Sequence, residues 1–139
     1  MSYKSLPSMP ADSVTSLSKL KGKHILVVED NELMGRILVD LLKQWDHATH
    51  VRSGQEALRA IKENPPDIIL LDISLRDTSG VEVARVVRRD NKTKFTPILA
   101  MSGSPGEKRQ CLEAGCNDFI LKPFEISQLL DQLTALLPS

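Results

Sequence analysis

Five polar residues directly end or follow short apolar runs of the sequence. Glu29 and Asp30 come after HILVV, Asp72 ends DIILLD, Ser102 ends PILAMS and Lys122 ends DFILK. Carboxylates that meet without compensation repel one another and raise one another's pKa, whereas a hard divalent cation neutralises them through oxygen ligands. If the fold brings these residues together, they predict a magnesium site with a hydroxyl and an ammonium group beside it.

Each of these residues has an ordinary explanation when it is taken alone. A Glu-Asp pair after a strand is usually a solvated turn, and Asp72 fits the N-cap of a turn or helix. Ser102 fits a turn and Lys122 a surface charge. It is improbable that all of these residues stand at the ends of apolar runs by accident. The set as a whole therefore favours a functional site.

The apolar runs predict strands. They are short and rich in β-branched residues, as expected for strands that are covered on both faces. HATHV adds a weaker example. The five strands are expected over residues 24–28, 47–51, 67–72, 97–102 and 118–122.

The segments between these runs show helical spacing of apolar residues. Ser53 and Glu56 have the form of a capping box, and Gly115 suits a left-handed C-terminal cap. Helices are expected over 31–44, from 53 through 61, after Gly80, over 107–114 and around the last leucines. In the first helix the expected buried stripe is Leu33, Ile37, Leu38, Leu41 and Leu42.

Five strand-helix alternations with short connections predict an α/β fold with helices on both faces of a parallel sheet. The expected architecture is a flavodoxin-like, doubly wound sheet of five strands in the order 2-1-3-4-5, with five helices. Ligands of such sheets bind outside the carboxyl ends of the strands where the strand order reverses, here strands one and three. That edge is where the five polar residues are expected to meet.

Composition limits the function classes. A chain of 139 residues that is 41% hydrophobic fits one globular domain, expected over 23–139 after a serine- and proline-containing leader over 1–22. Lys plus Arg and Asp plus Glu both number 18, so no net field favours direct nucleic-acid or membrane binding. No apolar run reaches about 18 residues, and a cytoplasmic location is expected.

The cysteines and histidines do not suggest a metal site. Cys111 and Cys116 lie far along the chain from the three histidines and are expected to be reduced core thiols. His47 and His50 are three residues apart, which in a strand places them on opposite faces.

The motifs resemble those of the receiver domain of two-component response regulators, of the chemotaxis-regulator type. The resemblance rests on Glu29-Asp30, the LLD that ends in Asp72, Ser102-Gly103 and Lys122-Pro123-Phe124, and it covers residues 23 to 137. It implies that Asp72 is the phosphoacceptor of His-Asp phosphotransfer. The expected partners are a sensor histidine kinase or a phosphotransfer protein, and a downstream protein effector.

The resemblance also implies a metal site. Mg²⁺, with Mn²⁺ as a substitute, would be held by Glu29, Asp30, Asp72 and the backbone carbonyl of Ser74. The phosphoryl group would be bound by Ser102, Gly103 and Lys122. Lys122 and Pro123 would be joined by a cis peptide that aims the lysine.

Phosphorylation is expected to switch the surface of the fourth helix, fifth strand and fifth helix, with Phe119 as the rotating aromatic. A phosphorylation-dependent dimer is compatible with this. Ser74 and Ser104 hold positions where fast-hydrolysing receivers tend to carry an amide or acid, so they are expected to tune dephosphorylation. The chain departs from the family pattern at Leu75-Arg76, where Met-Pro is usual, so the conformation of this loop is open.

Three other functions compete with this one. A haloacid-dehalogenase-type phosphatase would need an acid two residues after Asp72, where Ser74 stands. An unphosphorylated pseudo-receiver would not need the intact acidic set. The receiver module of a hybrid histidine kinase and a stand-alone regulator both fit the sequence, and no catalysis beyond the domain's own phosphorylation and dephosphorylation is expected.

Overall fold

The computed structural model describes residues 18–44 and 47–138 of the chain. Within them it confirms the expected fold: a parallel sheet of five strands in the order β2-β1-β3-β4-β5. The strands are β1 (Ile25–Val28), β2 (Ala48–Val51), β3 (Ile68–Asp72), β4 (Ile98–Ser102) and β5 (Asp118–Leu121). The α-helices are α2 (Glu32–Leu42), α3 (Gly54–Glu63), α4 (Gly80–Arg89), α5 (Lys108–Glu113) and α6 (Ile126–Leu136), and two 3₁₀ turns, η2 (Ser18–Leu20) and η3 (Pro105–Glu107), complete the order.

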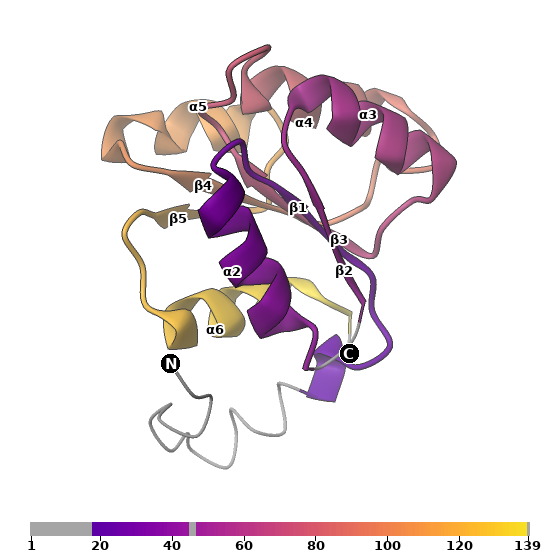
Figure 1. Cartoon of the computed structure of the whole chain (residues 1–139). Helices are drawn as coiled ribbons and strands as arrows, with labels where there is room; N and C mark the ends of the chain where they lie inside the picture. Colours follow the sequence, from indigo (N-terminus) through magenta and orange to yellow (C-terminus); the bar gives the residue numbers. More distant parts are fainter. Residues whose placement is uncertain (1–17, 45–46, 139) are drawn as a thin grey trace.

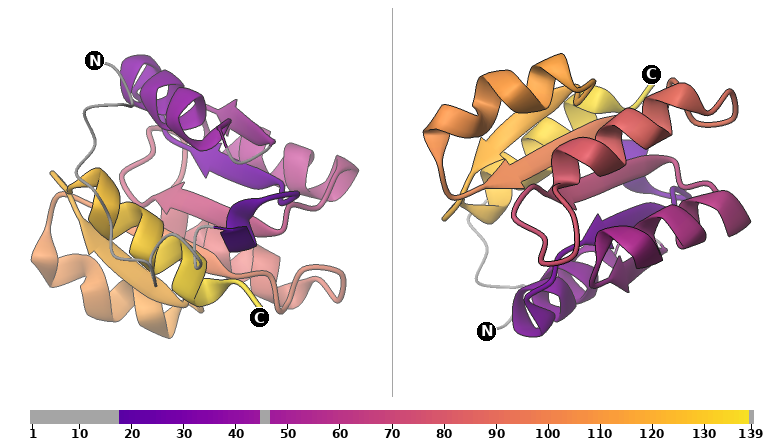
Figure 2. Two further views of the ribbon diagram at one scale, coloured as in Figure 1. Left: turned by 90° about the horizontal axis from the view of Figure 1, so that it is seen from below. Right: turned by 90° about the horizontal axis from the view of Figure 1, so that it is seen from above.

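The helices cover both faces of the sheet, with α2 and α6 on one face and α3, α4 and α5 on the other (Figures 1 and 2). Alternate strand residues point to opposite faces. In β3, Ile68 and Leu70 belong to the apolar cluster under α2 and α6, whereas Ile69 and Leu71 belong to the cluster under α3, α4 and α5. All five residues of β3 are buried, which explains its unbroken apolar run.

Side-chain caps fix where three helices begin. Asn31 accepts a hydrogen bond from Met34 N at 2.9 Å at the start of α2, and Ser79 accepts one from Val81 N at the start of α4. Ser53 accepts from Glu56 N at 3.0 Å, as the capping box predicts. The Glu56 carboxylate reaches back to the amide of Arg52.

The expected stripe of the first helix is wrong at two positions. Leu33 and Ile37 are 69% and 50% exposed, while the residues that face the core are Gly35, Leu38, Val39, Leu41 and Leu42. The cause lies in β2. The His50 ring occupies the space where a side chain of residue 35 would stand, so α2 turns its glycine toward the strand and Leu33 and Ile37 toward solvent.

The division of the chain at residue 22 stays a prediction, because residues 1–17 of the expected leader lie outside the described part. One residue of that leader does belong to the packed domain. Leu20, at the end of η2, is fully buried in the cluster under α2 and α6. Within the described residues no helix combines the length and apolar character that crossing a membrane requires.

Gly80 allows α4 to begin directly against the end of β3. Its amide donates to Ile73 O at 3.0 Å, and a Cβ at this position would lie 2.5 Å from the Asp72 carbonyl oxygen and 2.8 Å from Ile73 Cα. Because both atoms belong to the backbone, Gly80→Ala is expected to lower the free energy of unfolding by about 2–3 kcal/mol. Gly106→Ala is the matched control, since the nearest atom to its Cβ is 3.8 Å away. Urea denaturation of both variants checks this, and equal stability of the two would contradict it.

Candidate functional site

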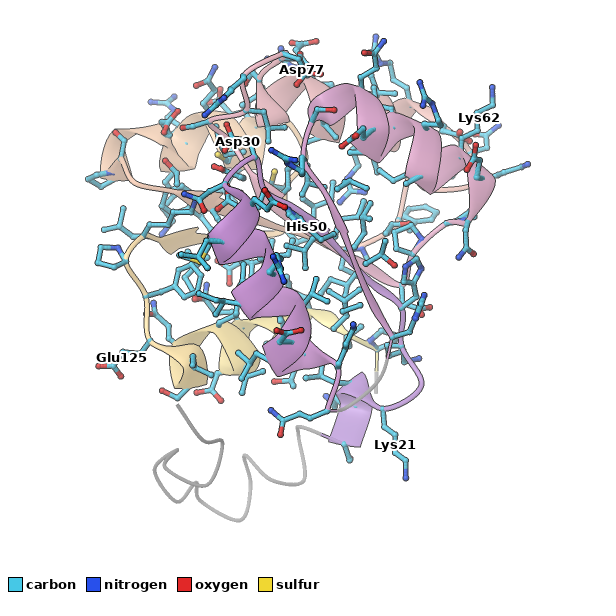
Figure 3. The ribbon with its side chains drawn as sticks, in the orientation of Figure 1. Lys21, Asp30, His50, Lys62, Asp77 and Glu125 are labelled. Atoms are coloured by element: carbon cyan, nitrogen blue, oxygen red, sulfur yellow. The ribbon has the colours of Figure 1, made fainter. Side chains whose placement is uncertain are left out.

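The sheet register brings the predicted acidic residues to one level. Val28 pairs with Leu71 across β1 and β3, so Glu29, directly after β1, and Asp72, the last residue of β3, stand side by side. Asp30 follows Glu29 in the loop to α2 and lies at the end of the molecule opposite Lys21 (Figure 3). One oxygen atom from each of Glu29, Asp30 and Asp72 lies within 4.8 Å of the others. The expected convergence of the three carboxylates is therefore present.

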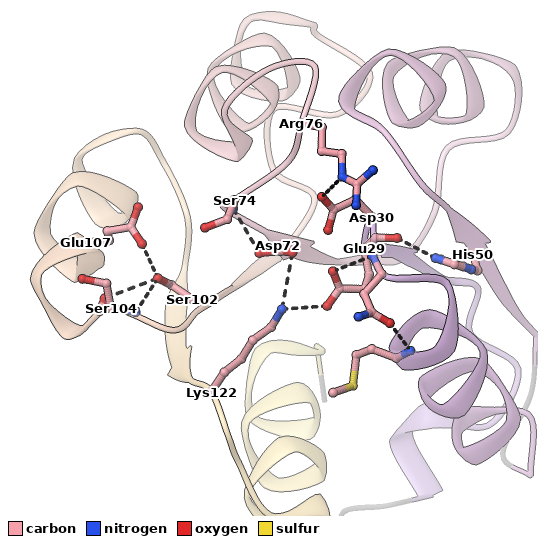
Figure 4. Close-up of polar contacts among 12 residues, drawn as sticks. Glu29, Asp30, His50, Asp72, Ser74, Arg76, Ser102, Ser104, Glu107 and Lys122 are labelled. Atoms are coloured by element: carbon pink, nitrogen blue, oxygen red, sulfur yellow. Dashed lines mark hydrogen bonds and ion pairs between the residues drawn. The ribbon is translucent and has the colours of Figure 1, made fainter.

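Lys122 reaches this cluster from the end of β5. Its Nζ donates to Glu29 Oε1 at 2.6 Å and lies 3.3 Å from Asp72 Oδ2 (Figure 4). Burial lowers the pKa of Lys122, but the hydrogen bond to Glu29 and the charge of Asp72 outweigh burial, so its pKa is raised. Lys122 is therefore a firmly charged cation between two buried carboxylates. The Lys122-Pro123 peptide bond is cis, as the resemblance implies.

Burial distinguishes the three carboxylates. Glu29 and Asp72 are 1% and 3% exposed, whereas Asp30 is only partly covered. Burial raises the pKa of Glu29 to about 7, and Asp72 adds to this rise while Lys122 opposes it. A bound cation would favour the ionised form of Glu29.

The loop after β3 closes the outer side of the site. Ser74 N donates to Asp72 Oδ1 at 3.0 Å, and Arg76 Nε lies 3.6 Å from Asp30 Oδ2, with the Arg76 side chain 90% exposed. Asp77, farther along this loop, accepts hydrogen bonds from Gly54 N at 2.9 Å and Gln55 N at 3.0 Å at the start of α3. These two amides hold the pKa of Asp77 below its usual range. The loop that lacks the usual Met-Pro is thus tied to α3 by a carboxylate.

Ser102 lies at the expected strand end, but Figure 4 shows its hydroxyl linked to Ser104 and Glu107 and not to Asp72. Its Oγ accepts from Ser104 N at 3.0 Å and donates to the Glu107 carboxylate. Gly103, the residue after Ser102, is exposed, and a Cβ at this position would meet nothing within 4 Å. The structure therefore brings Ser102 to the expected edge of the sheet, but Ser102 makes no hydrogen bond to the acidic cluster. Phe119 is half-buried and packs against the cluster under α3, α4 and α5.

Two residues of this region were missed by sequence reasoning. His50 Nε2 lies 2.7 Å from the Glu29 carbonyl oxygen. A side chain of β2 therefore holds the backbone at Glu29, directly after β1. Glu107 is the second, through its bond to Ser102. No local pattern marks either residue: the His50 contact joins β2 to the end of β1, and the Glu107 contact, although only five residues from Ser102, depends on how the segment after β4 folds. The buried, unpaired Cys111 and Cys116 agree with their expected role as core thiols.

The donor set fits a hard divalent cation. All three groups offer carboxylate oxygens, the ligand type that Mg²⁺ prefers. When all are ionised, the three carboxylates and the Lys122 ammonium leave a net charge of −2, which one divalent cation balances. The partly covered Asp30 leaves an approach from solvent, as a site that keeps several water ligands requires.

Comparisons with known proteins identify similar chains. A family model described as the response regulator receiver domain matches residues 25–134. The polar-differentiation response regulator DivK of Brucella ovis is 32% identical over 118 residues, which cover 83% of this chain and 96% of DivK.

Solved structures show the same similarity. The crystal structure of a response regulator from Chloroflexus aurantiacus has a TM-score of 0.79 at 31% identity and covers 84% of this chain and 98% of its own. The receiver domain of a sensor histidine kinase from Pseudomonas aeruginosa, solved with a magnesium ion coordinated in its active-site cleft, has a TM-score of 0.73 at 30% identity, over 81% of this chain and 94% of its own.

Proposed function

Because this chain belongs to the response regulator receiver domain family and so serves two-component signalling, we propose that Asp72 is its phosphoacceptor. One observation carries the proposal. Asp72 ends β3 as a buried carboxylate that lies beside two further carboxylates and 3.3 Å from the Lys122 ammonium. A nucleophile, a site for a divalent cation and a fixed positive charge thus meet at one point.

The reaction transfers a phosphoryl group from a phosphohistidine to Asp72. An Asp72 carboxylate oxygen forms the new bond to phosphorus as the bond between phosphorus and the donor imidazole nitrogen breaks, and the electron pair of that bond stays on the nitrogen. The product is an acyl phosphate. No general base is needed, because the ionised carboxylate is itself the nucleophile.

The other residues stabilise charge and set geometry. Lys122, which donates to Glu29, would neutralise charge on the phosphoryl oxygens, and Ser102 and Gly103 would donate to them. Glu29, Asp30, Asp72 and the Ser74 carbonyl would hold Mg²⁺. When bound, the cation supplies further positive charge at the phosphoryl oxygens.

Incubation with acetyl phosphate and Mg²⁺ tests the proposal. We expect the intact mass to rise by one phosphoryl group, and peptide mapping to place the group on Asp72. Incubation with EDTA is the control and should prevent the addition. A chain that gains no phosphoryl group, or gains it elsewhere, would refute the assignment.

A haloacid-dehalogenase-type phosphatase lacks such support. Ser74 stands where a haloacid-dehalogenase-type phosphatase needs its acid, and Ser74 is exposed. The similarity to a response regulator and to a receiver of a sensor kinase supports both a stand-alone regulator and a hybrid-kinase module. In both cases the domain is a signalling module, with a histidine kinase or phosphotransfer protein as donor, a protein effector as target and a cytoplasmic site of action.

The output surface in this proposal is α5, β5 and α6. Phosphorylation would draw Ser102 toward the phosphoryl oxygens and leave room for Phe119 to turn inward, which biases two pre-existing states. Lys122 N donates to Ser102 O at 2.7 Å, so β4 and β5 are joined at the level where both changes occur.

The acyl phosphate is expected to be long-lived. Hydrolysis needs a water aligned opposite the Asp72 oxygen, and the short, exposed side chains of Ser74 and Ser104 orient it poorly. Ser74→Asn and Ser104→Glu should each accelerate decay several-fold, because their longer polar side chains can hold that water. Decay is followed by intact mass after removal of the donor, with Ser104→Ala as a control that should match the wild type. Unchanged or slower decay in both longer variants would refute this role.

A further inference from the structure

The hydroxyl of Ser102 is fully occupied by its own segment. Ser102 is 0% exposed, so water does not compete for its hydroxyl. Its oxygen accepts from Ser104 N at 3.0 Å, and its proton is directed to the Glu107 carboxylate, with Ser104 O at 3.3 Å as a weaker alternative. A hydroxyl has only one proton, so it cannot donate to Glu107 and to a phosphoryl oxygen at the same time.

The Glu107 carboxylate is committed to this contact. Glu107 ends η3 and immediately precedes α5, where an acidic side chain commonly caps the first free amides of a helix. Here it makes no capping hydrogen bond and turns to Ser102 instead. Figure 4 shows Ser102, Ser104 and Glu107 as one linked group, separate from the group formed by Asp72, Glu29 and Lys122.

We propose that Glu107 is a positioning residue that holds the Ser102 hydroxyl away from Asp72 and thereby opposes phosphorylation. The inference rests on the proposed function and adds the regulation of that site. A hydrogen bond from a neutral hydroxyl to a carboxylate is stronger than one to a neutral acceptor. A phosphoryl group on Asp72 must therefore take the hydroxyl from another anion. The apparent affinity of a ligand that imitates this group is its intrinsic affinity multiplied by the fraction of molecules in which the hydroxyl is already free of Glu107.

Removing the carboxylate should free the hydroxyl. With beryllofluoride as the probe, which imitates a phosphoryl group on a carboxylate, Glu107→Gln should bind about three- to tenfold more tightly than the wild type, and Glu107→Ala at least as tightly as Glu107→Gln. Glu113→Gln is the matched control. It removes an exposed carboxylate at the end of α5, which pairs with Arg109 at 3.0 Å, and the affinity of this variant should equal that of the wild type.

A double-mutant cycle shows whether Glu107 acts through Ser102. Binding is measured by isothermal titration calorimetry at saturating Mg²⁺ for the wild type, Glu107→Gln, Ser102→Ala and the double variant. In the Ser102→Ala background, Glu107→Gln should change the affinity less than about twofold, because no hydroxyl remains to be released. Mg²⁺ affinity without beryllofluoride should not change in any Glu107 variant, since Glu107 does not belong to the acidic cluster.

The outcomes separate this inference from the proposed function. A wild type that binds no beryllofluoride would overturn both. A wild type that binds it while Glu107→Gln binds equally or more weakly would overturn the role of Glu107 alone. The same gain with and without Ser102 would also overturn it, because Glu107 would then act as a repelling charge. A gain restricted to chains that contain Ser102 supports the inference.

Discussion

Asp72→Asn is expected to abolish phosphorylation by acetyl phosphate, with no mass gain under conditions that modify the wild type completely. The substitution removes the nucleophilic carboxylate but keeps a side chain of the same shape. The carbonyl oxygen of asparagine can still accept the hydrogen bond from Ser74 N that Asp72 Oδ1 accepts at 3.0 Å. The loss should therefore be chemical and not structural.

The unfolding temperature of Asp72→Asn distinguishes a chemical loss of phosphorylation from a structural one. Asp72 is one of three converging carboxylates, so its neutralisation relieves repulsion of Glu29 and Asp30 while weakening the pairing with Lys122. We expect unfolding at a temperature equal to or above that of the wild type. Asp40→Asn, an exposed position on α2, is the control and should be phosphorylated normally. A phosphorylated Asp72→Asn protein, at the wild-type rate, would remove Asp72 from its proposed role.

Asp30→Asn is expected to weaken Mg²⁺ binding by at least about tenfold. It deletes one of the three charges that the cation balances, and it does so at the carboxylate that is most open to solvent, where the incoming ion exchanges water for protein oxygen. Titration calorimetry at constant ionic strength measures the effect. Phosphorylation of the variant should need correspondingly more cation.

Arg76→Ala is a control in which the Mg²⁺ affinity is expected to rise instead of fall. Its guanidinium lies 3.6 Å from the Asp30 carboxylate, so it competes with a cation for that group. Because the Arg76 side chain is 90% exposed, the competition is weak, and Arg76→Ala should raise Mg²⁺ affinity about twofold or less. Equal Mg²⁺ affinity in Asp30→Asn and the wild type would exclude Asp30 from the metal site.

The sequence was sufficient to predict the fold and the edge of the sheet at which the site lies. Dense apolar runs that end abruptly in an acid or a serine mark the buried strands β1, β3 and β4 and their carboxyl ends, because strand burial on both faces leaves polar residues only where the strand stops. With the strand order known, Glu29, Asp30 and Asp72 had to be neighbours. The register of β1 with β3 agrees with this expectation.

Sequence spacing did not predict which face of α2 is buried. Leu33 and Ile37 fit the helical period as well as Leu38 and Leu41 do, and local spacing cannot rank them. The choice is made by the contact between Gly35 and the His50 ring of β2, in which a missing side chain and a bulky ring fit together. Such complementarity depends on two segments at once.

The sequence by itself determined the elements, their order and the chemical types gathered at one edge, because these follow from local periodicity and from the rules of parallel sheets. Only the tertiary structure decided the pairings within that edge: Lys122 with Glu29, Asp77 with the start of α3, and Ser102 with Glu107. Each pairing depends on where a side chain points to within an ångström or so, since a hydrogen bond is lost beyond about 3.5 Å. That precision comes from packing the whole chain, and no short segment contains it.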